Sequence, residues 1–569
     1  MTTQRSLRGS IQILMASGVV CAAGALTWQG ISASQTEPPV TARTIPISLS
    51  QAQPAPPSTP SDSSVARLFA THCASCHGPM GKGDGPAAGA LYPKPRDFTA
   101  GVFRFKSTPD AQYPTAADLT RIISSGIPRT AMPGFSGVLA PKEVTDLGTF
   151  VMTLAPARTP ADDLRQPLPI PDQPEFTGRL VEQGRKVYVA MGCGLCHGDS
   201  GKGDGGASWS LKDDSGWPLP PADFTLGIYK AGTRPEDLYR TIMIGVPGTP
   251  MPNFRGAIAS GVKVEGLDPN VDMVWALTAY LKSLSAGHPA PGAAAGVDIP
   301  VEHLADSAML TDPMHSGWKA IVPQRLSLSP LWQRKGFASA VEVRAASASG
   351  MLAIEVSWPD ASANFAVGGV DQFADAGGMM FSLNSEIPPL AMGALSAAAN
   401  GDKAPFLVNL WQWKADRQIN ADDGRIHDGP DAGRTLPDLY PYKTGDLSSG
   451  PLTEHDPVFI SAWQAGNPKS DPTMLGRTVL EANAQGIGTL TWQPGVDQDV
   501  TGVGRHIDGW WHIVFVRSLT VSSTLDVDFA SLSRIPVAFA VWDGAAADRN
   551  GTKLISGWHF LTLAEPERK

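Results

Sequence analysis

The chain has 569 residues, a formal net charge of −9 at pH 7 and charged side chains at 17% of its positions. This length predicts three or four domains, and a negative net charge without a basic cluster argues against nucleic acid as a partner. Of the five cysteines, only Cys21 lies outside two short motifs. Without that N-terminal cysteine, none remains for a structural disulfide or a separate zinc site.

The N-terminal segment is typical of a secretory signal. Arg5 and Arg8 precede an apolar run over residues 11–26, and small residues follow that run. The alternative is an uncleaved membrane anchor, although the run is short for a bilayer span. We expect a signal peptide over residues 1–33 and a proline-rich linker over residues 34–62.

The pattern Cys-x-x-Cys-His occurs twice, at Cys73–His77 and at Cys193–His197. Thiols three residues apart on a helical turn can both reach one porphyrin edge, and the histidine that follows can bind the iron. A single copy could also be a redox pair or half of a zinc site, but here the surroundings repeat as well. We expect two covalent haems c, with Cys73, Cys76, Cys193 and Cys196 as attachment residues and His77 and His197 as proximal ligands. Because such haems are attached outside the bacterial inner membrane, the motifs and the signal together predict a periplasmic protein.

Proline-rich segments predict the domain limits. Linkers are expected over residues 156–175 and 287–299. The three folded domains are then expected over residues 63–155, 176–286 and 300–569.

The first two domains form an internal repeat. Residues 78–85 match 198–205, and residues 126–133 match 245–252. Both domains resemble all-α class I cytochrome c domains over essentially their whole length.

That resemblance supplies the sixth iron ligands. In the family a methionine of a Met-Pro loop binds the iron, and the corresponding residues here are Met132 and Met251. The alternative is that these methionines only pack against the ring, since methionine is a common gap-filler. With both axial positions filled, neither iron has an open site, and the two domains are expected to carry electrons rather than to perform catalysis.

The last domain has a different pattern. Apolar and β-branched residues alternate over residues 341–345, 351–358, 510–516 and 535–542. This period predicts a mainly antiparallel, sandwich-like β domain. Eleven of the fifteen tryptophans lie in this domain, which is consistent with a large apolar cavity or an extensive interface.

Two segments carry a further resemblance, Pro388–Gly393 and the run from Trp542 to Trp558. They are similar to the haem b (gamma) subunit of the type II DMSO-reductase-family molybdenum enzymes, such as ethylbenzene dehydrogenase, dimethylsulfide dehydrogenase and chlorate, selenate, nitrate or nitrite oxidoreductases. The resemblance implies one non-covalent haem b held by Met392 and Lys553. A lysine amine binds iron only when it is neutral, and burial favours the neutral form.

Without the resemblance, Met392 would be a core methionine and Lys553 a solvated lysine beside the turn signal of Asn550. His506 or His512 could also replace one haem ligand. The long stretch between Trp413 and Trp510 suggests an insertion relative to simpler relatives.

The resemblance implies an electron-transfer subunit without catalytic residues of its own. Its expected partners are a molybdopterin catalytic subunit, an iron–sulfur subunit and a soluble or membrane electron carrier. One alternative is a self-contained haem enzyme with an open iron in the C-terminal domain. Another is a cytochrome c fused to a sugar-binding or adhesion module that holds no haem b.

Overall fold

A computed structural model describes residues 64–109, 112–159, 163–287, 292–304, 307–334, 336–365, 371–391, 407–423, 468, 473–474, 476–521 and 523–563. The expected signal peptide, the linker over residues 34–62, Cys21 and Met392 lie outside these described residues. Much of the expected insertion between Trp413 and Trp510 lies outside them as well.

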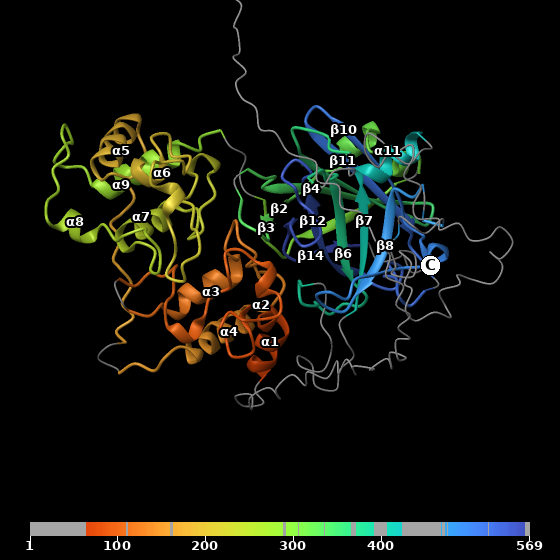
Figure 1. Cartoon of the computed structure of the whole chain (residues 1–569), viewed down its shortest axis with the longest axis horizontal. Coiled ribbons are helices and arrows are strands. Elements are labelled where there is room, and N and C mark those ends of the chain that lie inside the picture. The colour runs from red at the N-terminus through yellow and green to blue at the C-terminus, as the bar shows by residue number, and fades with distance from the viewer. Residues whose placement is uncertain are drawn as a thin grey trace, which may run out of the picture. The chain divides into compact units, whose positions relative to one another are not determined.

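The first domain is helical, as predicted. It contains α1 (Ser64–His72), α2 (Ala74–His77), α3 (Ala116–Ser125) and α4 (Pro141–Leu154), with 3-10 turns η1 (Ala88–Ala90) and η2 (Phe98–Ala100) (Figure 1). Helix α3 begins at a capping box, in which the Thr115 hydroxyl accepts from the Asp118 amide at 3.1 Å and the Asp118 carboxylate accepts from the Thr115 amide at 3.0 Å. The apolar faces of the helices bury Phe69, Leu119 and Leu147 in one core, because water is excluded from their apolar surface.

The second domain repeats this order. It contains α5 (Gly178–Ala190), α6 (Gly194–His197), α7 (Pro235–Ile244), α8 (Arg255–Ala259) and α9 (Met273–Ser283), with 3-10 turns η3 (Ser208–Ser210) and η4 (Phe224–Leu226). Helices α5 and α9 approach closely at Gly184, where an added Cβ would lie 1.9 Å from the carbonyl oxygen of Ala276. Only glycine permits that approach, and it lets Trp275 pack into the core beside Tyr239.

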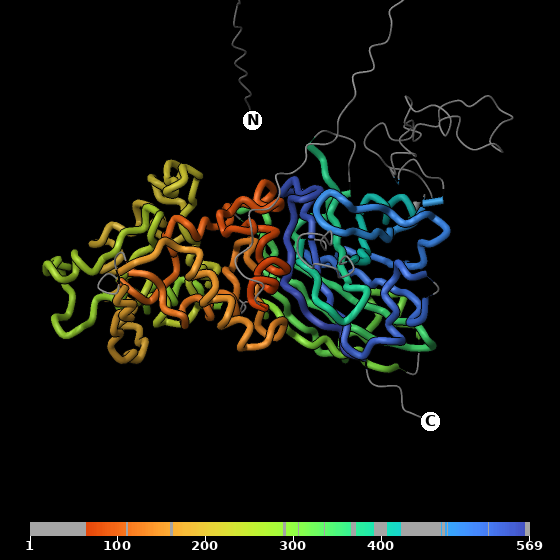
Figure 2. The backbone as a smooth tube through the Cα atoms, turned by 90° about the horizontal axis from the view of Figure 1, so that it is seen from below, coloured from red at the N-terminus to blue at the C-terminus, as the bar shows by residue number. Residues whose placement is uncertain are grey.

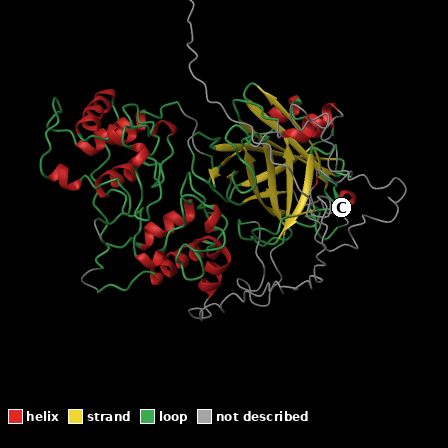
Figure 3. Cartoon of the chain, in the orientation of Figure 1, coloured by secondary structure: helices red, strands yellow, loops and turns green. Residues whose placement is uncertain are grey.

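The C-terminal domain is built on one curled sheet (Figure 3). Its strands are β1 (Asp298–His303), β2 (Gln324–Ser327), β3 (Ser329–Pro330), β4 (Ala340–Ala348), β5 (Met351–Pro359), β6 (Ala376–Ser382), β7 (Val408–Lys414), β8 (Val479–Ala484), β9 (Thr491–Trp492), β10 (Thr501–Ile507), β11 (Trp510–Ser518), β12 (Arg534–Trp542), β13 (Leu554–Ile555) and β14 (His559–Thr562). Its helices and 3-10 turns are η5 (Ala308–Thr311), η6 (Ser316–Ala320), α11 (Ala415–Asp423) and η10 (Gly495–Asp497).

The main strand order is β10-β11-β5-β4-β1-β14-β12-β6-β7-β8-β9. All strand pairs are antiparallel except that β1 runs parallel to both β4 and β14. The prediction of a mainly antiparallel domain is therefore confirmed. Strand β1 joins the two halves of the sheet, whose strands run from green to blue in Figure 2.

Large aromatic side chains from both halves of the sheet fill its interior. Trp358 of β5, Trp511 of β11 and Trp413 of β7 are at most 1% exposed and belong to one core cluster. The rings of Trp413 and Trp511 meet edge to face with centroids 4.9 Å apart. Many of the tryptophans that the sequence assigned to a cavity or an interface thus form the core, where replacement by alanine typically costs about 3–5 kcal/mol.

Candidate functional site

Each Cys-x-x-Cys-His motif occupies one helical turn. The His77 amide donates to the Cys73 carbonyl at 2.9 Å, and the His197 amide donates to the Cys193 carbonyl at the same distance. This turn brings both thiols and the histidine of each motif to one side of a short helix, α2 or α6. The arrangement matches the geometry that the spacing predicts for haem attachment.

The two motif histidines are oriented in the same way. The Nδ1 atom of His77 lies 3.2 Å from the Arg96 carbonyl oxygen, and that of His197 lies 3.0 Å from the Ala222 carbonyl oxygen. Burial lowers the pKa of both imidazoles and so favours their neutral form. A neutral imidazole that donates from Nδ1 keeps the lone pair of Nε2 for a metal. In this tautomer, Nε2 of each histidine is available as a ligand atom.

An aromatic ring stacks on the face of each imidazole. Phe98 stacks on His77 with ring centroids 4.5 Å apart, and Phe224 stacks on His197 at 4.3 Å. The two phenylalanines occupy equivalent places in the repeat, in the turns η2 and η4. This packing fixes the plane of each histidine, as a proximal ligand requires.

The thiols are not poised as a redox pair. Burial raises the pKa of Cys73 to about 12 and that of Cys193 to about 11. Reactive cysteine pairs have lowered pKa values and thiolate character. The environment thus disfavours the redox alternative.

The two methionine loops share one hydrogen-bond pattern. The carbonyl of Met132 accepts from the Ile127 amide at 3.1 Å, and the carbonyl of Met251 accepts from the Val246 amide at 3.1 Å. The Met132 amide donates to Thr130 Oγ1 at 3.2 Å, and the second loop has the same bond at the same distance. Each methionine is therefore held in a defined loop rather than on a free chain.

A cavity of about 470 Å³ is lined mainly by residues of the second domain. Its lining includes all four expected haem residues of that domain, namely Cys193, Cys196, His197 and Met251. Thiols, imidazole and thioether are the donor set that a covalent His/Met haem requires, so the residues fit the group. In the first domain, Cys73 and Met132 border the same core cluster.

The C-terminal domain contains a second cavity, of about 910 Å³, over strands β6, β7, β8 and β12. Lys553 lines it, just before β13, with Nζ 4.9 Å from the ring centroid of Trp542. Burial lowers the pKa of Lys553 to about 8. The lysine therefore faces a cavity rather than open solvent, although Asn550 does form the predicted turn with φ 50°.

Met392 lies outside the described residues, but Leu390, two positions earlier, lines the same cavity. The buried thioether of Met380 lines it too.

Two cations that line this cavity, Arg417 and Arg477, were not predicted from the sequence. Arg417 donates to the carbonyl and to the side-chain oxygen of Gln412, both at 2.9 Å. Arg417 lies in the first turn of α11, directly after the tryptophan-containing strand β7, and no local pattern in the sequence marked it.

The two histidines considered as replacement ligands are engaged elsewhere. His506 Nε2 lies 2.8 Å from the Asp360 carbonyl oxygen, and His512 Nδ1 lies 3.3 Å from Glu355 Oε1. Neither residue lines the cavity that contains Lys553. The geometry gives no support to a histidine ligand in this domain.

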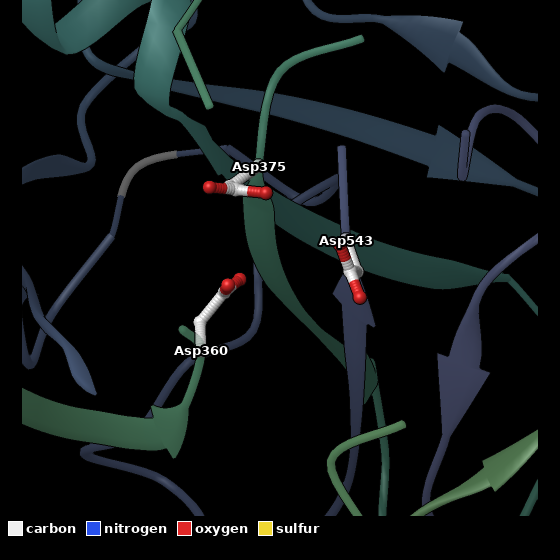
Figure 4. A group of neighbouring side chains, drawn as sticks. All are labelled: Asp360, Asp375 and Asp543. Carbon is white, nitrogen blue, oxygen red and sulfur yellow. The ribbon is translucent and has the colours of Figure 1, made fainter. Parts of the chain in front are cut away.

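Three carboxylates converge where strands β5, β6 and β12 meet, namely Asp360, Asp375 and Asp543 (Figure 4). Asp375 accepts hydrogen bonds from the Gly544 amide at 2.7 Å and from Trp511 Nε1 at 3.0 Å. Burial raises the pKa of Asp375 to about 7. These contacts tie separate strand ends together, which is a structural role.

Comparison with known proteins defines the class of each domain. Residues 64–155 and 181–285 match the cytochrome c family, and residues 301–553 match the family described as ethylbenzene dehydrogenase. The chain thus consists of two cytochrome c domains followed by the haem b (gamma subunit) domain of the ethylbenzene dehydrogenase family. Cytochrome c domains receive their haem outside the cytoplasm and so imply an extracytoplasmic location. Among the described residues, no helix has the length and apolarity needed to cross a bilayer.

The relatives come from enzyme complexes. The chain is 24% identical over 270 residues to the ORF7 heme subunit ascribed to a respiratory nitrate reductase of Haloferax mediterranei, covering 46% of this chain and 72% of that protein. It is 25% identical over 213 residues to the chlorate reductase subunit gamma of Ideonella dechloratans, covering 37% of this chain and 60% of that protein. A chain of the Kuenenia stuttgartiensis reducing HAO-like protein complex is similar to 39% of this chain over 96% of its own length, with 33% identity and a TM-score of 0.34.

Proposed function

We propose that this chain is a periplasmic triheme electron-transfer subunit of a molybdenum oxidoreductase complex. It holds two haems c and one haem b, and it relays electrons between the iron–sulfur clusters of a partner subunit and an external carrier. The relationship to a chlorate reductase gamma subunit supports this proposal. The observation that carries the proposal is the cavity of the C-terminal domain, which is lined by Lys553, a lysine with a lowered pKa. Two cytochrome c domains precede this domain in the same chain.

In the cytochrome domains, the cysteine pairs would attach the haems, and His77 and His197 would bind the irons through Nε2. Met132 and Met251 would supply the second protein ligand of each iron. Haem supplies reversible one-electron chemistry, and thioether ligation favours the ferrous state and raises the reduction potential. With a histidine and a methionine as ligands, each haem would exchange electrons and would leave no position for a substrate.

In the C-terminal domain, Lys553 and Met392 would hold the haem b. The cavity wall contributes Trp411, Trp542 and Met379 as apolar surface. A largely apolar wall excludes water and lowers the pKa of the lysine, which makes its lone pair more readily available to iron. The protein thereby prepares an unusual amine ligand by desolvation.

Binding of carbon monoxide by the reduced full-length chain tests this function. Three six-coordinate haems give ferrous spectra that carbon monoxide leaves unchanged. Replacing Lys553 with alanine opens one axial position, and the haem b of that variant then binds carbon monoxide. The exposed Lys263, replaced with alanine, serves as the matched control and behaves as the parent chain.

Rapid carbon monoxide binding by the haem b of the parent chain would contradict the proposal. That result would instead favour a self-contained haem enzyme with an open iron. A chain that contains covalent haem only would point to a C-terminal domain without haem b.

A further inference from the structure

The haem cavity of the second cytochrome domain is not built by that domain alone. Arg104, Phe105 and Arg129 of the first domain line it together with Lys230 of the second domain and Gln333 of the C-terminal domain. Three of these five residues are cations. A cationic wall is unusual in a cavity whose remaining lining is mainly apolar, because burying charge without a counter-charge is costly.

Arg129 is the least expected of these residues. Its backbone has φ 62°, in the left-handed region, and its counterpart in the repeat is Gly248 with φ 73°. A non-glycine residue is strained in that region, and such strain marks functional positions. The first domain thus keeps an arginine where glycine would fit better.

The side chain of Arg129 is also buried and poorly neutralised. The residue is 9% exposed, and its guanidinium lies 5.5 Å from the ring centroid of Phe337. No ion pair is formed by this guanidinium with any of the residues that the structure describes. Burial lowers its pKa, while the charge of Asp223 acts in the opposite direction.

Lys230 and Arg104 occupy equivalent positions in the repeat, each directly after the aromatic residue Tyr229 or Phe103. Lys230 donates to Gln333 Oε1 at 3.3 Å. Burial and the nearby charges of Arg129 and Arg104 lower the pKa of Lys230 to about 7. The three cations therefore lie close enough to repel one another.

Besides Asp223, whose charge acts on Arg129, two carboxylates pair with Arg104 and neutralise the cluster only in part. Arg104 Nη2 lies 2.8 Å from Asp213 Oδ2 and 3.6 Å from Asp214 Oδ1. Asp214 is shared with Arg96 at 3.1 Å. The Nε atom of Arg104 is buried without a hydrogen-bond partner among the described residues. The cluster therefore carries excess positive charge, and one buried donor of Arg104 lacks a partner among the described residues.

We propose that Arg129, Arg104 and Lys230 bind the propionate carboxylates of the haem in the second cytochrome domain. The inference rests on the proposed function, which places a covalent haem in that cavity. Haem carries two propionates, and arginine binds carboxylates through charge-assisted, often bidentate, hydrogen bonds. The first domain thus supplies cations that complete the haem site of the second.

This assignment gives the first domain control over the potential of the second haem. A cation close to the haem favours the reduced state, because reduction removes one positive charge from the iron. Loss of the cation lowers the potential. For one elementary charge at about 10 Å and an effective dielectric of about 20, the reduction equilibrium changes by roughly tenfold, and tenfold corresponds to about 59 mV for one electron.

The test uses the full-length chain with Arg129→Gly, which installs the residue of the repeat at a backbone position that favours glycine. A second variant, Lys230→Gln, removes the positive charge of Lys230 and keeps a hydrogen-bond donor for Gln333 Oε1. Lys263→Gln, at an exposed site of the second domain, is the control of equal charge. The reduction potential of each haem is measured by spectroelectrochemistry. The signal that shifts in a Met251→His variant identifies the haem of the second domain.

We expect Arg129→Gly to change the reduction equilibrium of the second haem by roughly tenfold, which lowers its potential by about 59 mV. Lys230→Gln lowers the potential by less, because a pKa of about 7 leaves this lysine only partly charged near neutral pH. Lys263→Gln leaves that potential unchanged. An unchanged second potential in Arg129→Gly and Lys230→Gln, with both covalent haems present, overturns the inference. Absence of covalent haem from the second domain in the parent chain contradicts the proposed function itself, so the two failures are distinguishable by haem content.

Discussion

Replacing Lys553 with methionine should show how much the burial of this lysine lowers the free energy of unfolding of the C-terminal domain. In the domain without haem, burial lowers the pKa of Lys553 from 10.5 to about 8. The unfolded chain then binds more protons than the folded one between pH 8 and pH 10.5. The stability of the parent domain therefore rises with pH through this window and is lowest below pH 8.

The shift sets the magnitude of the effect. About 2.5 pKa units at about 1.36 kcal/mol per unit give roughly 3 kcal/mol, an upper value because the side chain retains some contact with water. Methionine has a similar length and no charge, so its contribution does not vary with pH. We expect the advantage of Lys553→Met over the parent to shrink by up to about 3 kcal/mol between pH 7 and pH 10.5.

Urea unfolding of residues 292–569, which keep the whole of β1, measures this difference in protein produced without haem. The assay compares the free energy of unfolding of the parent and of Lys553→Met at pH 7 and at pH 10.5. All other titrating groups are common to both proteins and cancel in the difference. A difference that is independent of pH would refute the argument that the cavity desolvates this lysine.

Three further predictions concern the other sites. Replacing Cys73 and Cys76 with alanine should remove one of two covalent haems from a haem-stained denaturing gel, and retention of both would contradict the attachment sites. Replacing Met251 with histidine should lower the potential of that haem and abolish its methionine–iron charge-transfer band; unchanged spectra and potential would make Met251 a packing residue. Burial raises the pKa of Asp375 to about 7, so the folded state still holds a proton that the unfolded state releases near pH 4. The free energy of unfolding therefore falls as the pH rises from about 4 to about 7. Urea unfolding should then show the Asp375→Asn variant gaining up to about 4 kcal/mol relative to the parent over that window, and no relative gain would contradict the raised pKa.

The haem c sites could be predicted because their chemistry is local in the sequence. The spacing of Cys73, Cys76 and His77 requires only one helical turn, and the structure has that turn. The partner of the proximal histidine could not be predicted in the same way. The Arg96 carbonyl lies 19 residues further along the chain, and only the folded loop brings it to Nδ1.

The β domain shows the same division between local and tertiary information. Period-two patterns identified β4, β5, β11 and β12. The sequence did not show that β5, β11 and β12 are buried on both faces over most of their length. The parallel pairing of β1 with β4 and β14 was not predicted, since it depends on how two halves of a sheet join. The direction of Lys553 was equally hidden, because a turn signal beside it is compatible with either a solvated or a buried side chain.

The cationic wall of the second haem cavity lay beyond sequence reasoning altogether. Arg129 and Lys230 are 101 positions apart and belong to different domains, and nothing in their local patterns connects them. The departure of Arg129 from the glycine of the repeat was visible in the sequence. Its meaning depends on the tertiary placement that turns the side chain toward the cavity of the second domain.

The haem content of the purified full-length chain tests the account most directly. Pyridine haemochrome spectra separate covalent haem c from haem b that acidic acetone extracts, and the number of each per chain can be counted. We expect two haems c and one haem b in every chain, all low-spin. Two haems c without haem b, in a chain supplied with haem and fully folded, would contradict the claim that the C-terminal domain is a haem b module.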